Sequence, residues 1–400
     1  MSTFANIPPA DPAAQEVLGR IQRRSLLIGG AGAVALILGA VMDREQFFRS
    51  YLVGYMLWVG VTLGCLAILM LQHLSGGRWG LAIRRTMEAG SRNIKLMALL
   101  FIPVLLGMKG LYPWVDPGSD PILLHKAVYM NPAMFVARAI FYFVIWGMLA
   151  WLLSRWSGQQ DQEPGRDLRS LLRGWSAAGL LLYAATVTLA AIDWVMSLDP
   201  HWTSTIYGML FMAGQCLSAL CVAIGMVALL ARFKPLSQAV HPEIFHDLGK
   251  LVLTFVILWA YFSFSQLLII WSGNLPEETS WYLNRWSGGW EVVGLLLVAF
   301  HFALPFALLL SRDLKRAARK LALLAGIILV MRAVDLFWLI EPNFAANHGH
   351  LRPSWMDLVA PIALGGIWMA AFLRELQQRP VLPLHDPELA SLTASEHAAD

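Results

Sequence analysis

The sequence predicts an all-α polytopic membrane protein with about ten transmembrane helices. Its 400 residues are 58% hydrophobic and only 14% charged, whereas charged residues make up roughly 25% of an average soluble protein. The apolar residues gather in runs of about 20, the length that crosses a hydrocarbon layer ~30 Å thick. Many of the 17 Trp residues lie at the ends of these runs, where aromatic residues anchor helices at the membrane surface. A disordered chain and an ordinary soluble domain are therefore excluded.

Ten apolar runs define the expected spans. Lipid-exposed backbone must satisfy its own hydrogen bonds, so each run is expected to be helical. The first run starts late for a signal peptide and is not followed by a convincing small-residue cleavage site, so it is expected to be retained. The runs are 26–42, 51–73, 94–112, 133–155, 171–196, 204–231, 247–272, 290–311, 319–340 and 355–375.

The placement of charge predicts the orientation, because Lys and Arg collect in cytoplasmic connections. Of the 30 Lys and Arg residues, 22 fall on the N-terminal segment, the even-numbered connections and the C-terminal segment, and two fall inside spans. Both termini are therefore expected in the cytoplasm. The net charge of +4 gives no reason to expect nucleic acid as a partner. The remaining six lie on the odd-numbered connections: Arg44, Arg49, Lys109, Lys126, Arg285 and Arg352.

An internal repeat links the ends of the fifth and ninth spans. Residues 191–202 and 333–344 share a pattern of Ala, a β-branched residue and Asp, then four variable residues, an aliphatic residue, an acid, Pro, a polar residue and an aromatic residue. Spans 2–5 and 6–9 are therefore expected to be two copies of a four-helix unit. The expected organisation is a cytoplasmic segment (1–25), a peripheral first span (26–50), two four-helix bundles (51–202 and 203–344), a peripheral last span (345–379) and a flexible cytoplasmic tail (380–400).

Ligands for metals and haems are scarce in the predicted spans. Cys65, Cys216 and Cys221 lie in apolar runs and form no Cys-x-x-Cys pair, so covalent haem c and a cysteine-bound iron–sulfur cluster are not expected on this chain. His301 is the only deep histidine, which excludes two bis-histidine b haems. We therefore expect no bound cofactor, no metal site and no catalytic residue within this chain.

Charged side chains inside the hydrocarbon are expensive, so each one is a candidate functional residue. Arg332 and Asp335 are three residues apart on the ninth span and share a helix face. Asp193 is the repeat counterpart of Asp335, and Arg138 lies at a similar depth, so an Arg138–Asp193 pair is expected. His301 lies about halfway along the eighth span. A structural clamp and a packing histidine are the alternative interpretations of these residues.

Further polar candidates lie on the second and seventh spans. Tyr261, Ser263, Ser265 and Gln266 follow one another along the seventh span. Three more candidates lie near the expected cytoplasmic side: His73 on the second span, and Asp247 and Lys250 on the seventh. Solvation or snorkelling is the alternative interpretation of these three residues.

Several motifs resemble those of the NrfD/polysulfide-reductase membrane superfamily, and more closely those of the ActF-type subunits of alternative complex III. The resemblance covers nearly the whole chain, and its most specific part is Met-Ser-Leu-Asp-Pro-His-Trp at 196–202. The motifs that carry it are Ser50–Leu52, Leu71–Gly80, Lys126–Asn131, Asp193–Trp202, His301-Phe302, Pro305-Phe306 and Leu310–Arg312.

The resemblance implies a role in quinol:cytochrome c oxidoreduction in the bacterial inner (cytoplasmic) membrane. Such complexes take electrons from a membrane quinol and pass them through iron–sulfur clusters and c haems on partner subunits to cytochrome c or a terminal oxidase. The implied partners are a homologous ActC-type membrane subunit, an iron–sulfur subunit, multihaem cytochrome c subunits and membrane lipid. The ActC-type subunit is the better candidate for the quinol site, and this chain for a structural and proton-conducting role.

The polar residues suggest a proton pathway under this hypothesis. It runs from Asp193 and Asp335 at the outer side, past Arg332, to His301. Arg332 is expected to tune Asp335 rather than to relay protons, because Arg does not deprotonate at ordinary pH. The expected bridging groups are Tyr261, Ser263 and Gln266, with Arg138 beside Asp193 and with His73, Asp247 and Lys250 at the cytoplasmic mouth.

Two other functions remain open at this point. One is a quinone-interacting anchor of a molybdopterin or polysulfide-type reductase. The other is a secondary transporter, which the repeat and the intramembrane charges favour. Pro103 and Pro305 lie in the third and eighth spans, which do not correspond in the two halves, so the broken-helix signature of transporters is weak.

Overall fold

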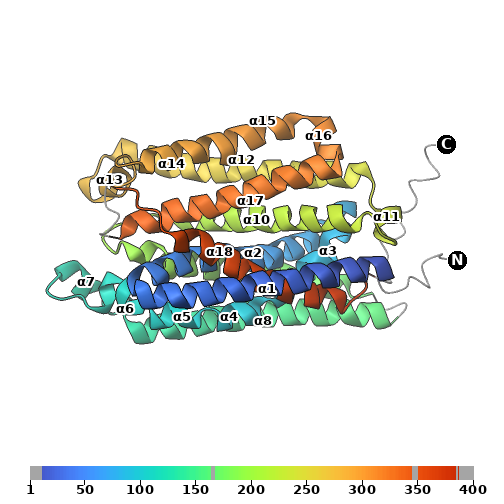
Figure 1. Ribbon diagram of the computed structural model, residues 1–400, viewed down its shortest axis with the longest axis horizontal. Coiled ribbons are helices and arrows are strands. Elements are labelled where there is room, and N and C mark those ends of the chain that lie inside the picture. The colour runs from blue at the N-terminus through green and yellow to red at the C-terminus, as the bar shows by residue number, and fades with distance from the viewer. Residues whose placement is uncertain (1–10, 164–166, 345–349, 384–385, 387–400) are drawn as a thin grey trace.

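The structure is a bundle of long helices that run along its long axis (Figure 1). It is a computed structural model, and it describes residues 11–163, 167–344, 350–383 and 386. Ten helices in this part of the chain are long and apolar enough to cross a membrane, and the described residues contain no strand. This confirms the predicted fold class, an all-α multi-pass membrane protein.

The bounds of the spans follow the apolar runs, with extensions and interruptions. The third span is divided into α3 (Arg78–Arg92), α4 (Ile94–Leu99) and α5 (Ile102–Leu106), and the eighth into α14 (Trp290–Leu296), the π-helical segment η3 (Leu297–Ala303) and α15 (Leu304–Leu310). The other spans are α1 (Pro12–Met42), α2 (Arg44–Ser75), α8 (Pro132–Gln162), α9 (Arg169–Trp194), α10 (Tyr207–Leu230), α12 (Pro242–Gly273), α17 (Ala318–Ile340) and α18 (Trp355–Gln377).

Short elements connect the spans at the two ends of the bundle. α11 and α16 lie at the end where α1 begins and α18 finishes, and α7 and α13 lie at the opposite end (Figure 1). The short elements are α6 (Met108–Leu111), η1 (Pro113–Val115), α7 (Pro121–Lys126), η2 (Met196–Leu198), α11 (Leu236–Ala239), α13 (Pro276–Leu283), α16 (Arg312–Arg316) and η4 (Glu341–Asn343).

The helices α2 and α10 form the centre of the bundle, and both are apolar on all sides. α2 also packs against α3, α9 and α18, and α10 against α9, α12 and α17. The two central helices touch through backbone, because a Cβ added to Gly64 would lie only 2.0 Å from the carbonyl oxygen of Gln215. Small residues allow this close approach, which gives membrane helices their packing energy in the absence of a hydrophobic drive.

The helices α1 and α18 form a pair at the edge of the bundle. Gly29 and Gly32 of α1 lie against the backbone or Cβ of α18, where an added Cβ would come within 2.6 Å of Ile367 N and Ala363 Cβ. The other face of α1 carries exposed residues such as Leu27 and Val41. In a membrane this face would contact lipid.

Three segments differ from the sequence prediction. The N-terminal segment expected at 1–25 is helical from Pro12, because Ala14 and Leu18, four residues apart, bury one helix face. The third span begins at Arg78 rather than at 94, because the charges of its first turns pair with one another. The tail expected to be flexible from 380 has a buried start at Val381 and Leu382, whereas residues 387–400 lie outside the described part.

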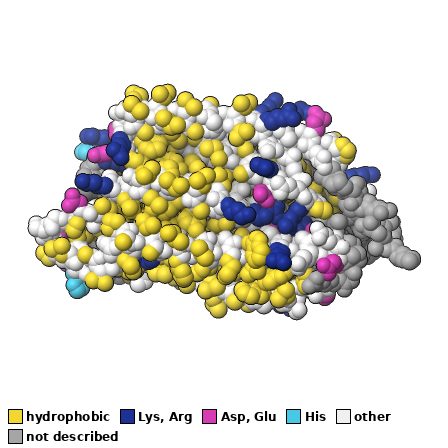
Figure 2. Space-filling model, turned by 90° about the horizontal axis from the view of Figure 1, so that it is seen from below, with side chains coloured by type: hydrophobic (Ala, Val, Ile, Leu, Met, Phe, Trp, Pro, Cys, Tyr) yellow, Lys and Arg dark blue, Asp and Glu magenta, His cyan; other side chains and the backbone are white. Residues whose placement is uncertain are grey.

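The surface has the polarity of a bundle that spans a membrane. Hydrophobic side chains cover much of the middle of one face, and many of its Lys and Arg side chains lie toward the two ends (Figure 2). Exposed apolar residues on α8, α12 and α14, such as Phe141, Phe264 and Leu295, belong to the surface that a bilayer would cover.

The contact between α2 and α10 can be tested with matched alanine substitutions. Gly64→Ala should lower the free energy of unfolding by about 1–3 kcal/mol, because a methyl group there overpacks the interface. The measurement is thermal unfolding of the purified chain in detergent.

The control is Gly225→Ala on α10, where an added Cβ meets no heavy atom within 4 Å. This change should stabilise the helix by up to about 1 kcal/mol, because Ala has the better helix propensity. Equal effects of the two substitutions would contradict the close contact.

Candidate functional site

The central group of the candidate site is the carboxylate of Asp335 on α17, which is 2% exposed. It forms an ion pair with Arg332 one turn earlier, as the three-residue spacing predicts. Trp259 of α12 donates its indole N–H to Asp335 Oδ2 over 3.1 Å. Arg332 reaches its position because α10 has Gly214 there, where an added Cβ would lie 2.3 Å from the guanidinium carbon.

His301 continues this cluster toward the eighth span. Its ring lies edge-on against Trp259, with the ring centroids 4.4 Å apart and an interplanar angle of 89°. The side chain is fully buried, and neither ring nitrogen has a hydrogen-bond partner among the described residues. His301 belongs to the π-helical segment η3, and π-helical turns within α-helices occur frequently at functional sites.

The repeat counterpart, Asp193 on α9, lies in a different environment. Arg138 of α8 donates to both carboxylate oxygens, from Nε over 2.8 Å and from Nη2 over 2.9 Å. The hydroxyl of Tyr142 donates to Oδ2 over 2.8 Å. The guanidinium also stacks on Tyr129 at 3.8 Å from the ring centroid. The sequence-predicted Arg138–Asp193 pair is therefore present as a bidentate pair.

The two carboxylates thus occupy equivalent helix ends and are equally buried, but they differ in their partners. α9 and α17 each end in a 3₁₀ turn, η2 and η4, just beyond their Asp. The Arg partner of Asp193 comes from a neighbouring helix, whereas that of Asp335 comes from its own helix. Both hydrogen bonds that Asp335 makes with described residues go to Oδ2, and its side chain lines a pocket.

The pocket beside Asp335 lies between α12, α14, η3 and α17 and has a volume of about 880 Å³. Three of the predicted bridging residues, Tyr261, Ser263 and Gln266, line it. Gln266 accepts from the Ser204 hydroxyl over 3.0 Å and donates to the Tyr282 hydroxyl over 3.3 Å. The structure therefore brings these residues to the same pocket as Asp335, in a mainly apolar lining that also includes Arg285 and Glu291.

Arg285 is a buried residue of this region that the sequence analysis placed on a connection. It is 1% exposed and lies on the ring of Trp281 at 3.4 Å from the centroid. Its guanidinium donates to the carbonyls of Trp281, Trp338 and Leu339 and to the side chain of Asn343. Burial lowers the pKa of Arg285 to about 9, still above neutral pH, so the residue remains a cation.

The predicted cytoplasmic residues do not form one group. Asp247 and Lys250 form an exposed pair on α12 over 3.1 Å. His73 on α2 lies within 2.9 Å of the Ser176 hydroxyl of α9. No contact between His73 and the Asp247–Lys250 pair is found among the described residues.

A charged network near the end of α3 was missed by the sequence analysis. Arg84 and Arg85 both approach Glu88, at 3.5 and 2.8 Å. Arg84 also pairs with Asp386 over 2.6 Å, and Arg85 pairs with Asp161 of α8. The spacing of Arg84, Arg85 and Glu88, with the acid three and four residues later, was the available signal. It was overlooked because this stretch was expected to be a solvated connection.

The described residues contain no group of three or more His, Cys, Asp or Glu side chains arranged to hold a metal ion. A comparison with protein-family models gives no match, and a search of curated proteins finds no relative.

The Arg138–Asp193 pair makes a prediction about stability. Arg138→Gln should lower the free energy of unfolding by about 3–5 kcal/mol, because it leaves a buried carboxylate without its cation. The double substitution Arg138→Gln/Asp193→Asn should recover most of this loss, since no buried charge then remains. The measurement is unfolding of the chain in detergent micelles, and a double variant as unstable as the single one would contradict the explanation.

Proposed function

We propose that this chain is the ActF-type membrane subunit of a bacterial alternative complex III, a quinol:cytochrome c oxidoreductase. The chain supports quinol oxidation as an accessory, proton-conducting subunit, and electrons pass through cofactors on its partners. The observation that carries the proposal is the buried cluster of Asp335, Arg332, Trp259 and His301 inside a membrane helix bundle. A buried charge pair in this environment is costly and is retained where a function needs it.

The geometry of the cluster supports proton exchange at Asp335. The carboxylate can take up a proton, and Arg332 holds the ionised form while remaining charged itself. The unpartnered ring nitrogens of His301, on the other side of Trp259, offer the next titratable group. Asp335 faces the pocket with Gln266 and Tyr282, which provide hydrogen-bonding groups on the outer side.

The arrangement of the chain supports a role as one component of a larger assembly. Only short elements connect the spans, so redox centres would belong to neighbouring proteins. These neighbours are an ActC-type membrane subunit, an iron–sulfur subunit and multihaem cytochromes c, with a terminal oxidase as the electron acceptor in some assemblies. The excess of Lys and Arg at the end that carries α11 and α16 supports a cytoplasmic location for both termini.

The first test is purification of the tagged full-length chain from its native membrane in a mild detergent. We expect it to bring down c-type haem, an iron–sulfur protein and a second ten-helix subunit, with quinol:cytochrome c oxidoreductase activity. A molybdopterin enzyme in their place would favour the reductase anchor instead. A chain that purifies alone and moves a solute in vesicles would contradict the proposal.

The second test is the substitution Asp335→Asn in the assembled complex. Asn keeps the shape of the side chain and can still accept from Trp259, but it cannot ionise. We expect quinol oxidation to continue with a lower ratio of protons to electrons, measured in reconstituted vesicles. His301→Leu should lower the same ratio.

Asp313→Asn is the matched control, because Asp313 lies exposed on α16. It should leave both activity and the proton ratio unchanged. An unaltered ratio in an assembled Asp335→Asn complex would argue against proton conduction through this cluster.

A further inference from the structure

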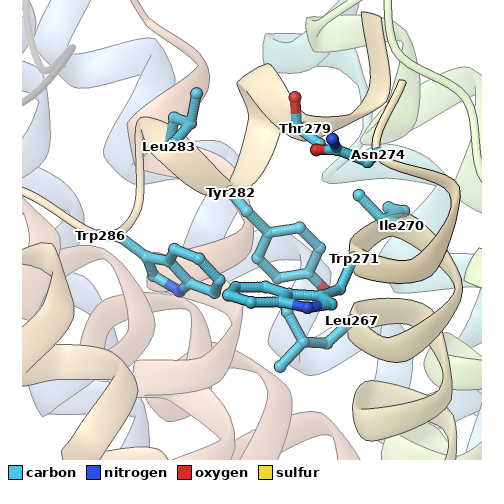
Figure 3. Close-up of a pocket in the computed structure, with 8 residues that line it drawn as sticks. All are labelled: Leu267, Ile270, Trp271, Asn274, Thr279, Tyr282, Leu283 and Trp286. Atoms are coloured by element: carbon cyan, nitrogen blue, oxygen red, sulfur yellow. The ribbon is translucent and has the colours of Figure 1, made fainter. Parts of the chain in front are cut away.

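The pocket beside Asp335 is one of two adjoining chambers. The larger one, of about 880 Å³, extends between α12, α14, η3 and α17. The smaller one, of about 410 Å³, lies where α12 ends and α13 begins (Figure 3). They share Leu267, Tyr282 and Trp286 as lining residues. Together they form one space, in which the larger chamber is mainly apolar and the smaller chamber is more polar.

The larger chamber is bordered by side chains that face the surrounding membrane. Phe264 of α12 is 62% exposed, and Leu295 of α14 is 68% exposed. Both line the chamber, so it opens toward the hydrocarbon rather than only toward water. A hydrocarbon chain fits such a lining, because it makes dispersion contacts there and exposes no polar group.

The smaller chamber has the character of the membrane surface. Trp271 and Trp286 lie side by side there, with ring centroids 5.7 Å apart (Figure 3). Aromatic rings of this kind collect at the level of lipid headgroups. Asn274 and Thr279 add an amide and a hydroxyl at the outer rim. The lining of the joined chambers therefore matches an amphiphile, with an apolar part for its tail and a polar rim at the membrane surface for its head.

The polar groups between the chambers favour a head with acceptor oxygens. Arg285 has no carboxylate partner among the described residues and lines the larger chamber. The indole N–H of Trp338, which lines it too, has no acceptor in the described part of the chain. A negatively charged oxygen near these groups would gain charge-assisted interactions in a region of low dielectric.

We propose that the two chambers bind one membrane phospholipid. Its acyl chain lies in the larger chamber between α12 and α14. Its phosphate lies where the two chambers meet, between Arg285, which lines the larger chamber, and the rim of the smaller chamber at Asn274 and Thr279. The acyl chain then covers the side of the chamber that Asp335 lines. This site concerns the chain alone and does not depend on the proposed membership of an oxidoreductase complex.

Gly294→Phe tests the site of the acyl chain. Gly294 lines the larger chamber, and an added Cβ would lie 3.6 Å from Trp338 Nε1, an ordinary contact. A phenyl ring at this position would project into the space that the acyl chain occupies. The matched control is Gly326→Phe on α17, which is exposed and has no heavy atom within 4 Å of an added Cβ.

Asn274→Gly tests the site of the phosphate. Asn274 has a φ of 47°, so Gly keeps the left-handed backbone and removes only the amide. This variant should keep the fold and retain the lipid several-fold less strongly.

The measurement is native mass spectrometry of the purified full-length chain after exchange into vesicles of phosphatidylglycerol and phosphatidylcholine. We expect one retained phospholipid on the wild type and on Gly326→Phe. Retention by Gly294→Phe should fall about tenfold or more, because the ring occupies the volume of the acyl chain and removes its dispersion contacts with the lining. Equal retention by Gly294→Phe and Gly326→Phe would overturn the proposal, as would retention of a quinone in place of the phospholipid.

Discussion

The contact between α2 and α10 is the constraint on which the rest of the structure depends. Gly214 and Gln215 are consecutive residues of α10, and each contacts different neighbouring helices. The backbone of Gln215 lies against Gly64 of α2, and its side chain accepts from the Tyr183 hydroxyl of α9 over 2.7 Å. Gly214 leaves the space that the guanidinium of Arg332 fills. A larger residue at 214 would therefore disturb the candidate site and the central packing together.

Low dielectric makes the pairing of charges the second constraint. Asp193 has a bidentate Arg and a Tyr hydroxyl, so its ionised form is held by three hydrogen bonds. Asp335 has one Arg and one Trp on a single oxygen, and it borders a pocket. The same helix end with the same acid thus supports a pair held by three hydrogen bonds in one place and a buried pair that borders a pocket in the other.

The sequence predicted those features that depend on local spacing. The lengths of the apolar runs gave ten spans, because the thickness of the hydrocarbon layer fixes the length of a helix that crosses it. The three-residue spacing of Arg332 and Asp335, and the equal depth of Arg138 and Asp193, gave both ion pairs. The sequence could not place Arg285, because three of its four acceptors, the carbonyls of Trp338 and Leu339 and the amide of Asn343, lie on a distant segment. The sequence analysis also missed the start of α3. The buried charges of this helix, Arg84 and Arg85, pair with Asp386 and Asp161, which come from elsewhere in the chain.

The difference between the two acids bears on which of them can exchange a proton. Protonating a carboxylate that is held by a bidentate Arg requires breaking several charge-assisted hydrogen bonds at once. Asp193 is therefore suited to hold α8 against α9. Asp335 can be protonated with Arg332 still stacked near Phe211, at 5.5 Å from the ring centroid, and with Trp259 still in place. In the proposed function, proton exchange therefore belongs to Asp335 of the second segment, and the acid of the first segment holds two helices together.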